Sequence, residues 1–277
     1  MAKKIILCDL DETLINREYE LTVPIQVLIS AIQAKQSNGC LIGLNSDTPL
    51  PALRNWADRF GMQGPLLCEK GQLLSLSPNG AAEVYGTMSA FFHQLRQQVI
   101  VRAHEEIPGA FVGIGDVTEF IIRQGRVFGV DRCAVLINGY RQCSFSGYAL
   151  ASHNGRLGTQ DLELYKRFCD LVFSIIGDDQ KYLDEPDQNQ YYGILVLHEK
   201  GASKNHAVER LIEQIDDNTE VIMIGDADAD IISIKHKIKL CAVSNASPSL
   251  KAKAQETGGI IASKAFTEGV VEILSLL

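Results

Sequence analysis

Acidic side chains follow two strongly apolar runs of the sequence, one near each end of the chain. Residues 5–8 lead directly into Asp9 and Asp11, and a second apolar run leads through a glycine into Asp226 and Asp230. Carboxylate oxygens are the ligands that Mg²⁺ prefers, and it typically takes one or two of them together with water and substrate phosphate. The pattern indicates a candidate Mg²⁺ site, although acidic loops and helix caps use the same residues.

Two further segments carry groups suited to an anion. Asn45-Ser46-Asp47 follows the apolar run 41–44 and precedes a Pro-led helix, where a hydroxyl and unpaired backbone N–H groups can hold phosphate. Lys204 lies at a predicted helix start, where the helix dipole slightly disfavours a cation. Taken singly, these are also an ordinary N-cap and an ordinary solvated lysine.

Short apolar runs alternate with amphipathic stretches at both ends of the chain, and this alternation predicts a parallel sheet with helices on both faces. Ligands of such sheets bind beyond the carboxyl ends of the strands, which is where Asp9 and Asp226 emerge. We expect strands at 5–7, 41–44, 221–224, 240–243 and 260–261, and helices at 24–34, 52–60, 204–215, 231–236 and 248–256.

The middle of the chain, about 72–197, has a different pattern. Longer strand-like runs at 119–122 and 133–137 stand among many glycines, with helices predicted at 88–104 and 162–176. The polar stretch 178–190 is expected to be an exposed loop. This pattern predicts an α+β insertion, roughly a second domain, within the parallel-sheet domain.

Composition excludes several classes of protein. The 277 residues are 46% hydrophobic and 22% charged, with a net charge of −8 and no basic cluster, so nucleic acid is not an expected partner. The apolar runs are too short to span a bilayer, and no export signal is recognised. Seven scattered cysteines without a C-x-x-C pair suit reduced thiols in a cytoplasmic protein.

Taken together, the four segments stand in the order of a known family. The chain resembles the haloacid dehalogenase superfamily hydrolases: residues 9–14 are similar to the first motif, 45–47 to the second, Lys204 to the third and 225–230 to the fourth. The insertion resembles the type II cap of the Cof-like, sugar-phosphatase branch, which 68–71, 244–246 and 267–270 also echo. The resemblance covers essentially the whole chain.

The resemblance implies a fold and a division into domains. The fold is a Rossmann-like, doubly wound parallel-sheet core with an inserted α+β type II cap domain. The catalytic core comprises 1–74 and 198–277, and the cap, 75–197, selects the substrate. Its candidate contacts are Arg123, Arg126, Arg132, Arg141 and Tyr148, although a solvated surface position explains each of them better, so none is assigned.

The resemblance also implies a Mg²⁺-dependent phosphatase that hydrolyses small phosphomonoesters through an aspartyl-phosphate. Asp9 is the implied nucleophile, and Asp11 the acid that protonates the leaving alcohol and then the base that activates water. Mg²⁺ is assigned to Asp9, the backbone carbonyl of Asp11, Asp226, and Asp230 directly or through water. Ser46 and Lys204 complete the clamp.

In the same scheme Asn45, Ser46, Asp47 and Lys204 contact the phosphate. The implied partner is a small phosphorylated metabolite, bound by a monomer or a homodimer. Two alternatives stay open: a phosphomutase similar to the phosphomannomutases, and a non-catalytic metabolite-binding protein of the same fold. Sugar phosphates, phosphoglycolate-like acids and nucleotides are all possible substrates.

Three single positions and the second motif depart from the branch. It usually has Gly where this chain has Glu12, Asn at the position of Lys70 and Asn at the position of Ala229, and its second motif is more often Thr-Gly-Arg than Ser46-Asp47-Thr48. None of these departures removes a catalytic group. Ala229 does remove a side chain that supports the metal ligands.

Overall fold

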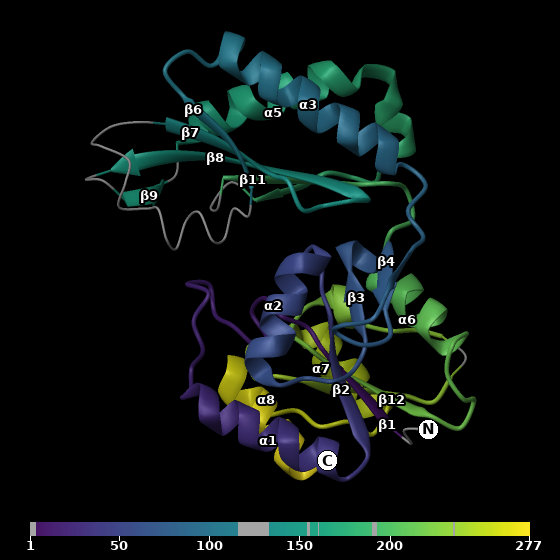
Figure 1. Cartoon of the computed structure of the whole chain (residues 1–277). Helices are drawn as coiled ribbons and strands as arrows, with labels where there is room; N and C mark the ends of the chain where they lie inside the picture. Colours follow the sequence, from purple (N-terminus) through teal and green to yellow (C-terminus); the bar gives the residue numbers. More distant parts are fainter. Residues whose placement is uncertain (1–3, 116–132, 154–155, 160, 190–192, 235) are drawn as a thin grey trace. The chain divides into compact units, whose positions relative to one another are not determined.

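The computed structural model describes residues 4–115, 133–153, 156–159, 161–189, 193–234 and 236–277 (Figure 1). Two compact units are formed, Met1–Tyr85 with Ala202–Leu277, and Gly86–Gly201. The first unit therefore extends eleven residues beyond the expected limit at residue 74, because β4 (Leu73–Ser75) and β5 (Ala82–Val84) join its sheet.

The first unit is built on a seven-stranded sheet in the order β13-β12-β1-β2-β3-β4-β5. The five strands from β13 to β3 run parallel, and β4 and β5 extend the sheet antiparallel. The parallel strands are β1 (Lys4–Cys8), β2 (Cys40–Asn45), β3 (Leu66–Cys68), β12 (Glu220–Gly225) and β13 (Ile238–Ala242). The predicted doubly wound α/β core is confirmed.

Register brings the ends of the central strands together. Cys8 of β1 lies opposite Leu44 of β2 on one side and Ile224 of β12 on the other. Residues directly after these three strands therefore share one edge of the sheet, as parallel strands require. The strands themselves are buried on both faces, which is why they appear in the sequence as continuous apolar runs.

Helices cover this sheet, and most of them were predicted within a few residues. Helices α1 (Ile25–Ser37) and α8 (Phe266–Leu276) pack against each other, and α2 (Leu50–Phe60) packs against β2 and β3. Helix α6 (Lys204–Ile212) packs against β3 and β4, and α7 (Pro248–Glu256) against β13. Residues 260–261 form only an isolated bridge, Ala242 to Ile261.

The helix predicted at 231–236 is wrong. A single turn, η3 (Asp228–Asp230), ends at Ile231, which has an extended backbone with ψ of 104°. The backbone N–H of Ser233 donates to the side-chain oxygen of Asn205 at 2.8 Å instead of to a helical carbonyl. Ile231 and Ile232 therefore follow the turn η3 without forming a helix.

The second unit is an α+β layer structure. Its sheet has the order β10-β11-β8-β7-β6, with β9 added to β8. The strands are β6 (Phe111–Gly115), β7 (Cys133–Asn138), β8 (Ser144–His153), β9 (Arg156–Thr159), β10 (Asp187–Asn189) and β11 (Ile194–His198). The strand expected at 119–122 lies outside the described residues. The expected loop 178–190 contains part of a short helix, η2 (Gly177–Tyr182), and β10, so it is not a loop throughout.

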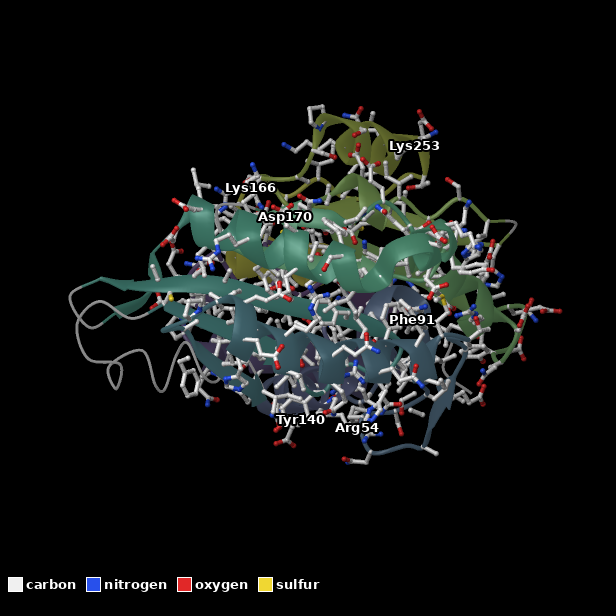
Figure 2. The ribbon with its side chains drawn as sticks, turned by 90° about the horizontal axis from the view of Figure 1, so that it is seen from above. Arg54, Phe91, Tyr140, Lys166, Asp170 and Lys253 are labelled. Atoms are coloured by element: carbon white, nitrogen blue, oxygen red, sulfur yellow. The ribbon has the colours of Figure 1, made fainter. Side chains whose placement is uncertain are left out.

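Helices α3 (Ser89–Glu106) and α5 (Leu162–Ile176) lie side by side on one face of this sheet, as Figure 1 shows. Phe92, Phe145 and Phe168 are fully buried between the two layers. Lys166 and Asp170, labelled in Figure 2, lie on the exposed side of α5. The alternation of buried and exposed positions is what made α5 predictable from the sequence.

The cysteines and the helices agree with the sequence analysis in two respects. All seven cysteines are free thiols, and five of them are buried. In the part of the chain that the structure describes, no helix combines the length and the apolar character needed to cross a bilayer.

Candidate active site

Asp9, Lys204 and Asp230 form a buried ion cluster at the carboxyl edge of the parallel sheet. The Nζ of Lys204 lies 2.7 Å from Oδ1 of Asp9 and 2.7 Å from Oδ1 of Asp230. Lys204 is 8% exposed, Asp9 5% and Asp230 0%, so the charges compensate one another away from bulk solvent. Residues separated by almost 200 positions in the sequence thus meet at one point.

Asp226 lies beside this cluster and is held by Thr13. The hydroxyl of Thr13 donates to Oδ1 of Asp226 at 2.9 Å, and it lies 3.5 Å from Oδ2 of Asp9. One carboxylate oxygen from each of Asp9, Asp226 and Asp230 lies within 4.8 Å of the others. Thr13 is fully buried, and the sequence analysis gave it no role.

The loop after β12 folds back, so that the side chain of Asp230 contacts the backbone at the beginning of the same loop. Its Oδ2 accepts from the backbone N–H groups of Asp226 at 3.0 Å and of Ala227 at 3.1 Å. A Cβ added to Gly225 would lie 2.3 Å from Cγ and Oδ2 of Asp230. Gly225 is therefore required for this close approach and not only for a tight turn.

Burial and mutual repulsion alter how these groups bind protons. Burial raises the pKa of Asp9 well above its ordinary value, and Asp230 and Asp11 raise it further, against the lowering effect of Lys204. Burial and the Asp230 charge likewise raise the pKa of Asp226. Burial by itself lowers the pKa of Lys204, but Asp230 and Asp9 outweigh it and the pKa is raised, so Lys204 stays charged.

The second predicted segment lies at the end of the neighbouring strand. Ser46 is buried, its N–H donates to Leu67 O at 2.9 Å, and its Oγ lies 3.1 Å from both the N–H and the hydroxyl of Thr48. The side chain of Asn45 is fully buried; its amide lies 3.9 Å from the sulfur of Met223, and its Oδ1 has no partner within the described residues.

Asp47 is half-buried in the turn between Ser46 and α2. It follows the strand end that borders the ion cluster, but it is absent from the group of carboxylates close enough to share one ion among the described residues. The structure therefore brings Asn45, Ser46 and Asp47 to the same sheet edge as the cluster.

Asp11 occupies a different environment from Asp9. Its residue is exposed, whereas Asp9 is buried, and its charge contributes to the raised pKa of Asp9. Glu12, where the branch usually has Gly, adopts a left-handed φ of 60°. The guanidinium of Arg17 donates to its carboxylate at 2.7 Å. The two aspartates of the first motif thus differ in solvation, which is one way to separate the roles of paired carboxylates.

Two segments that echoed the branch hold the first motif in place. The amide of Asn245 donates to Glu12 O at 2.8 Å and its oxygen accepts from Phe266 N–H at 3.1 Å. The hydroxyl of Thr267 donates to Leu14 O at 2.5 Å. Their role is to fix the loop that follows β1, which the sequence did not reveal.

The oxygen cluster fits a small hard cation. Oxygens around one Mg²⁺ lie at about 2.1 Å from it and so about 3 to 4 Å from each other, which is comparable with the separation seen here. Three carboxylates and one lysine also leave an uncompensated negative charge, which a divalent ion would neutralise. The donor set is therefore suitable for Mg²⁺.

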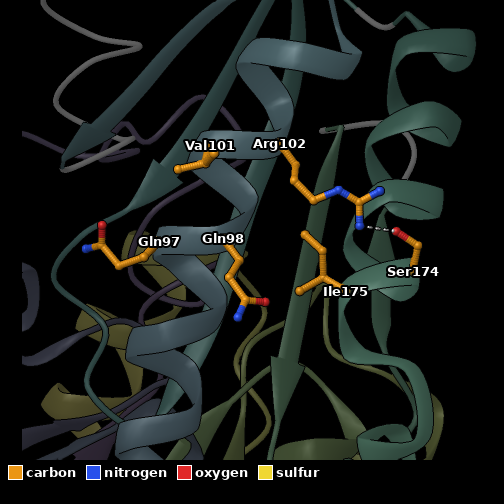
Figure 3. A pocket seen from close by; sticks show the side chains of 6 residues that line it. All are labelled: Gln97, Gln98, Val101, Arg102, Ser174 and Ile175. Carbon is orange, nitrogen blue, oxygen red and sulfur yellow. Dashed lines mark hydrogen bonds between the residues drawn. The ribbon is translucent and has the colours of Figure 1, made fainter.

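A hollow in the second unit has no comparable chemistry. Figure 3 shows this pocket of about 460 Å³ between α3 and α5, lined by Gln97, Gln98, Val101, Arg102, Ser174 and Ile175. Arg102 there donates to Ser174 at 3.0 Å and pairs with Glu106. None of these lining residues is a carboxylate, a histidine or a cysteine, so the pocket does not offer the metal ligands of the acidic cluster.

Comparisons with known proteins agree with this fold. A family model described as haloacid dehalogenase-like hydrolase matches residues 166–274. The phosphoglycolate phosphatase of Staphylothermus marinus is 27% identical over 270 residues, which cover 96% of this chain and 94% of that protein. A haloacid dehalogenase-like hydrolase from Bacteroides thetaiotaomicron has a TM-score of 0.66 at 16% identity, covering 99% and 98% of the two chains. A subclass IIB sugar phosphatase of that superfamily has a TM-score of 0.58 at 12% identity, covering 99% and 98%.

The matched region includes Lys204 and the 225–230 loop, and the first part of the chain brings Asp9 to the same cluster. The family match and the curated relative confirm the expected resemblance: the chain is similar to the haloacid dehalogenase-like hydrolases. Its second unit is an α+β structure, and the whole chain shares the fold of a subclass IIB sugar phosphatase.

Proposed function

We propose that this protein is a Mg²⁺-dependent phosphatase that hydrolyses small phosphomonoesters through an aspartyl-phosphate on Asp9. One observation carries the proposal: the Lys204 ammonium lies 2.7 Å from a buried aspartate that directly follows the first parallel strand. Such a cation lowers the pKa of the carboxylate against the raising effect of burial, and it offers positive charge to the transferring phosphoryl oxygens.

The two aspartates of the first motif divide the chemistry. Asp9 attacks phosphorus and displaces the alcohol, which forms a covalent intermediate and splits one displacement into two easier steps. Asp11, two residues later and solvent-exposed, donates its proton to the leaving oxygen and then takes a proton from the attacking water. Ser46 and Lys204, with Asn45 and Asp47 in the same segment, position the phosphate.

Asp9, the backbone carbonyl of Asp11, Asp226, and Asp230 directly or through water are the groups that hold Mg²⁺. When bound, the ion neutralises charge on the phosphoryl group. Thr13 keeps the Asp226 carboxylate turned toward Asp9 through its 2.9 Å hydrogen bond. Gly86–Gly201 acts as the cap that selects the substrate.

The similarity to a phosphoglycolate phosphatase and the shared fold with a sugar phosphatase support a small phosphorylated metabolite as substrate. The test is a panel of phosphomonoesters with Mg²⁺, measuring inorganic phosphate release without a bisphosphate activator. We expect turnover of at least one ester by the native protein and none by Asp9→Asn. Asp228→Asn is the matched control, because Asp228 is exposed and bonds to Ser247 and Ser249 and not to the cluster.

Acid quenching during turnover, followed by peptide mass spectrometry, should find one added phosphoryl group on the peptide that contains Asp9. Normal phosphate release by Asp9→Asn would remove the proposed nucleophile. Release that needs a hexose bisphosphate would support the phosphomutase instead. Failure of the native protein on the whole panel would support a non-catalytic member of the fold.

A further inference from the structure

Three consecutive residues after β3 adopt a left-handed backbone. Glu69, Lys70 and Gly71, which form the turn η1 (Glu69–Gly71), have φ values of 47°, 52° and 82°. This region is open to Gly, tolerated by Asn and disfavoured for other L-residues, because Cβ crowds the backbone. Two successive non-glycine residues in it store strain that the rest of the fold must hold.

The turn is fixed by contacts with α6. Gly71 lies so close to α6 that an added Cβ would be 2.5 Å from the Cβ of Ala207. The guanidinium of Arg210, also on α6, donates to Gly71 O and lies 4.4 Å from the ring centre of Tyr85. The backbone at Lys70 is therefore imposed by its surroundings, whichever side chain the position carries.

Lysine is an unexpected choice for this position. Asn or Gly would adopt the same backbone with less strain, and the related branch usually has Asn there. Lys70 is half-buried, and no hydrogen bond or ion pair with another described residue accounts for its charge. Neither backbone conformation nor an internal partner explains the side chain, which leaves an external partner.

The turn borders the catalytic cluster. In the sheet, Leu67 of β3 lies opposite Asn45, and the strand carrying Asp9 is the next one along. Two strand spacings correspond to about 10 Å. Ala207, which touches Gly71, follows Lys204 by three residues, about 5 Å along the helix. A lysine side chain extends roughly 6 Å, so from this turn it is long enough to reach toward a phosphate held at Asp9.

We propose that Lys70 is a specificity-determining residue that binds a carboxylate on the alcohol part of the substrate, which makes small phosphorylated hydroxy acids the preferred class. The inference rests on the proposed phosphatase function. A phosphate at Asp9 and Lys204 and a carboxylate two or three bonds away would meet two separate cations in the same unit. Lys70 provides the second of them as a point charge, which suits a small and flexible anion.

The experiment compares phosphoglycolate with ethyl phosphate, which has a methyl group in place of the carboxylate. The variants are Lys70→Met, which keeps length without charge, and Lys70→Asn, which suits the left-handed backbone. Lys253→Met is the control, because it removes one exposed positive charge on α7. The readouts are kcat and KM for both esters at low and high salt, and Tm for each variant.

We expect Lys70→Met and Lys70→Asn to lower kcat/KM for phosphoglycolate by about 10- to 100-fold, mainly through KM, because a charge-assisted contact is lost. The same variants should change kcat/KM for ethyl phosphate less than about 2-fold. The salt dependence of KM for phosphoglycolate should weaken. Lys70→Asn should raise Tm, since strain is relieved while selectivity is lost.

A purely structural lysine gives a different result. If Lys70→Asn raises Tm but leaves the ratio of the two kcat/KM values unchanged, the inference is overturned while the phosphatase function stands. Equal losses for both esters would also overturn it, because they would indicate a general effect on the site. If the native protein hydrolyses neither ester nor any other in the panel, the proposed function itself fails and the inference fails with it.

Discussion

Replacing Gly225 by alanine tests whether the contact between the Asp230 carboxylate and the start of its own loop stabilises the candidate active site. Gly225 does not have a left-handed backbone, so alanine is tolerated there conformationally. The obstacle is space: the new Cβ would lie 2.3 Å from Cγ and Oδ2 of Asp230. An ordinary contact is roughly 3.5 Å, so the carboxylate must move by about 1 Å.

A shift of that size breaks the contacts that depend on this carboxylate. Its bonds from the N–H groups of Asp226 and Ala227 are 3.0 and 3.1 Å long, and its other oxygen holds Lys204 at 2.7 Å. Hydrogen bonds to a charged group are each worth about 1.5 to 3 kcal/mol. Overpacking adds about 1 to 3 kcal/mol. Because partial relaxation recovers some of this, we expect a loss of about 3 to 5 kcal/mol in the free energy of unfolding.

Urea denaturation of Gly225→Ala measures this loss, with Gly115→Ala as the control because nothing lies within 4 Å of its added Cβ and its φ is ordinary. The double variant Gly225→Ala with Asp230→Gly removes the whole obstructing side chain, including the Cβ of Asp230, which lies 2.5 Å from the added Cβ. It should be no less stable than Asp230→Gly alone, within about 0.5 kcal/mol. A Gly225→Ala protein as stable as the Gly115→Ala control would refute the steric argument.

Two further results are expected. The raised pKa values of Asp9 and Asp226 mean that the folded state binds more protons than the unfolded chain. Without metal, the stability of the protein therefore decreases as the pH rises above 3.8, the ordinary pKa of these two groups. Mg²⁺ should accordingly raise Tm more at pH 8 than at pH 5, and this difference should shrink in Asp226→Asn. Glu272 has a lowered pKa because its carboxylate accepts a hydrogen bond from Ser263 N–H, with further bonds from the Ser263 hydroxyl and Lys264 N–H. Its contribution to the stability of the protein is therefore present above the ordinary pKa of 4.5 and is lost as the pH falls below that value. Glu272→Gln should accordingly lower Tm at pH 7 but not at pH 3, and an equal effect at both would contradict this account.

Much of the fold could be predicted because the spacing of apolar residues in the sequence follows the burial of the strands and helices. The parallel strands are buried on both faces and appear as apolar runs, while α5 alternates apolar and polar residues with helical spacing. The prediction of a helix at 231–236 was wrong because it considered only the spacing of the apolar residues. In the structure, the backbone N–H of Ser233 donates to the side chain of Asn205 and not to a helical carbonyl. Such tertiary hydrogen bonds leave no periodic trace in a sequence.

The principal groups of the site could be predicted for a different reason. Asp9 and Asp226 follow recognisable buried strands, and strand order places them at one edge. Thr13 could not be found in this way, because a buried threonine after a strand has no distinctive pattern, and its partner is 213 positions away. Arg141 was treated as no better than a solvated arginine, yet it is buried and bonds to the hydroxyls of Ser144 and Ser146 at 2.9 Å.

Two of the departures from the branch acquire a common explanation from the backbone. Glu12 and Lys70 both stand where the branch usually has Gly or Asn, and both have a left-handed φ, of 60° and 52°. Gly or Asn would adopt this backbone with less strain at both positions. At Glu12 the new carboxylate has an internal partner in Arg17, 2.7 Å away. Lys70 lacks a counterpart of that kind among the described residues, which is why its charge invites a functional explanation.

The distribution of hydrogen-bond donors also separates the roles of the three clustered carboxylates. Oδ1 of Asp230 accepts from Lys204, and its Oδ2 accepts from two backbone N–H groups. A carboxylate whose oxygens are already bonded to protein donors is a weaker direct ligand than one with an open oxygen. Asp9 uses Oδ1 for Lys204 and has only a long contact of 3.5 Å at Oδ2, and Asp226 has Thr13 on one oxygen. In the proposed mechanism, this distribution supports Asp9 and Asp226 as the direct ligands of Mg²⁺, with Asp230 acting through water and through the position that it imposes on Lys204.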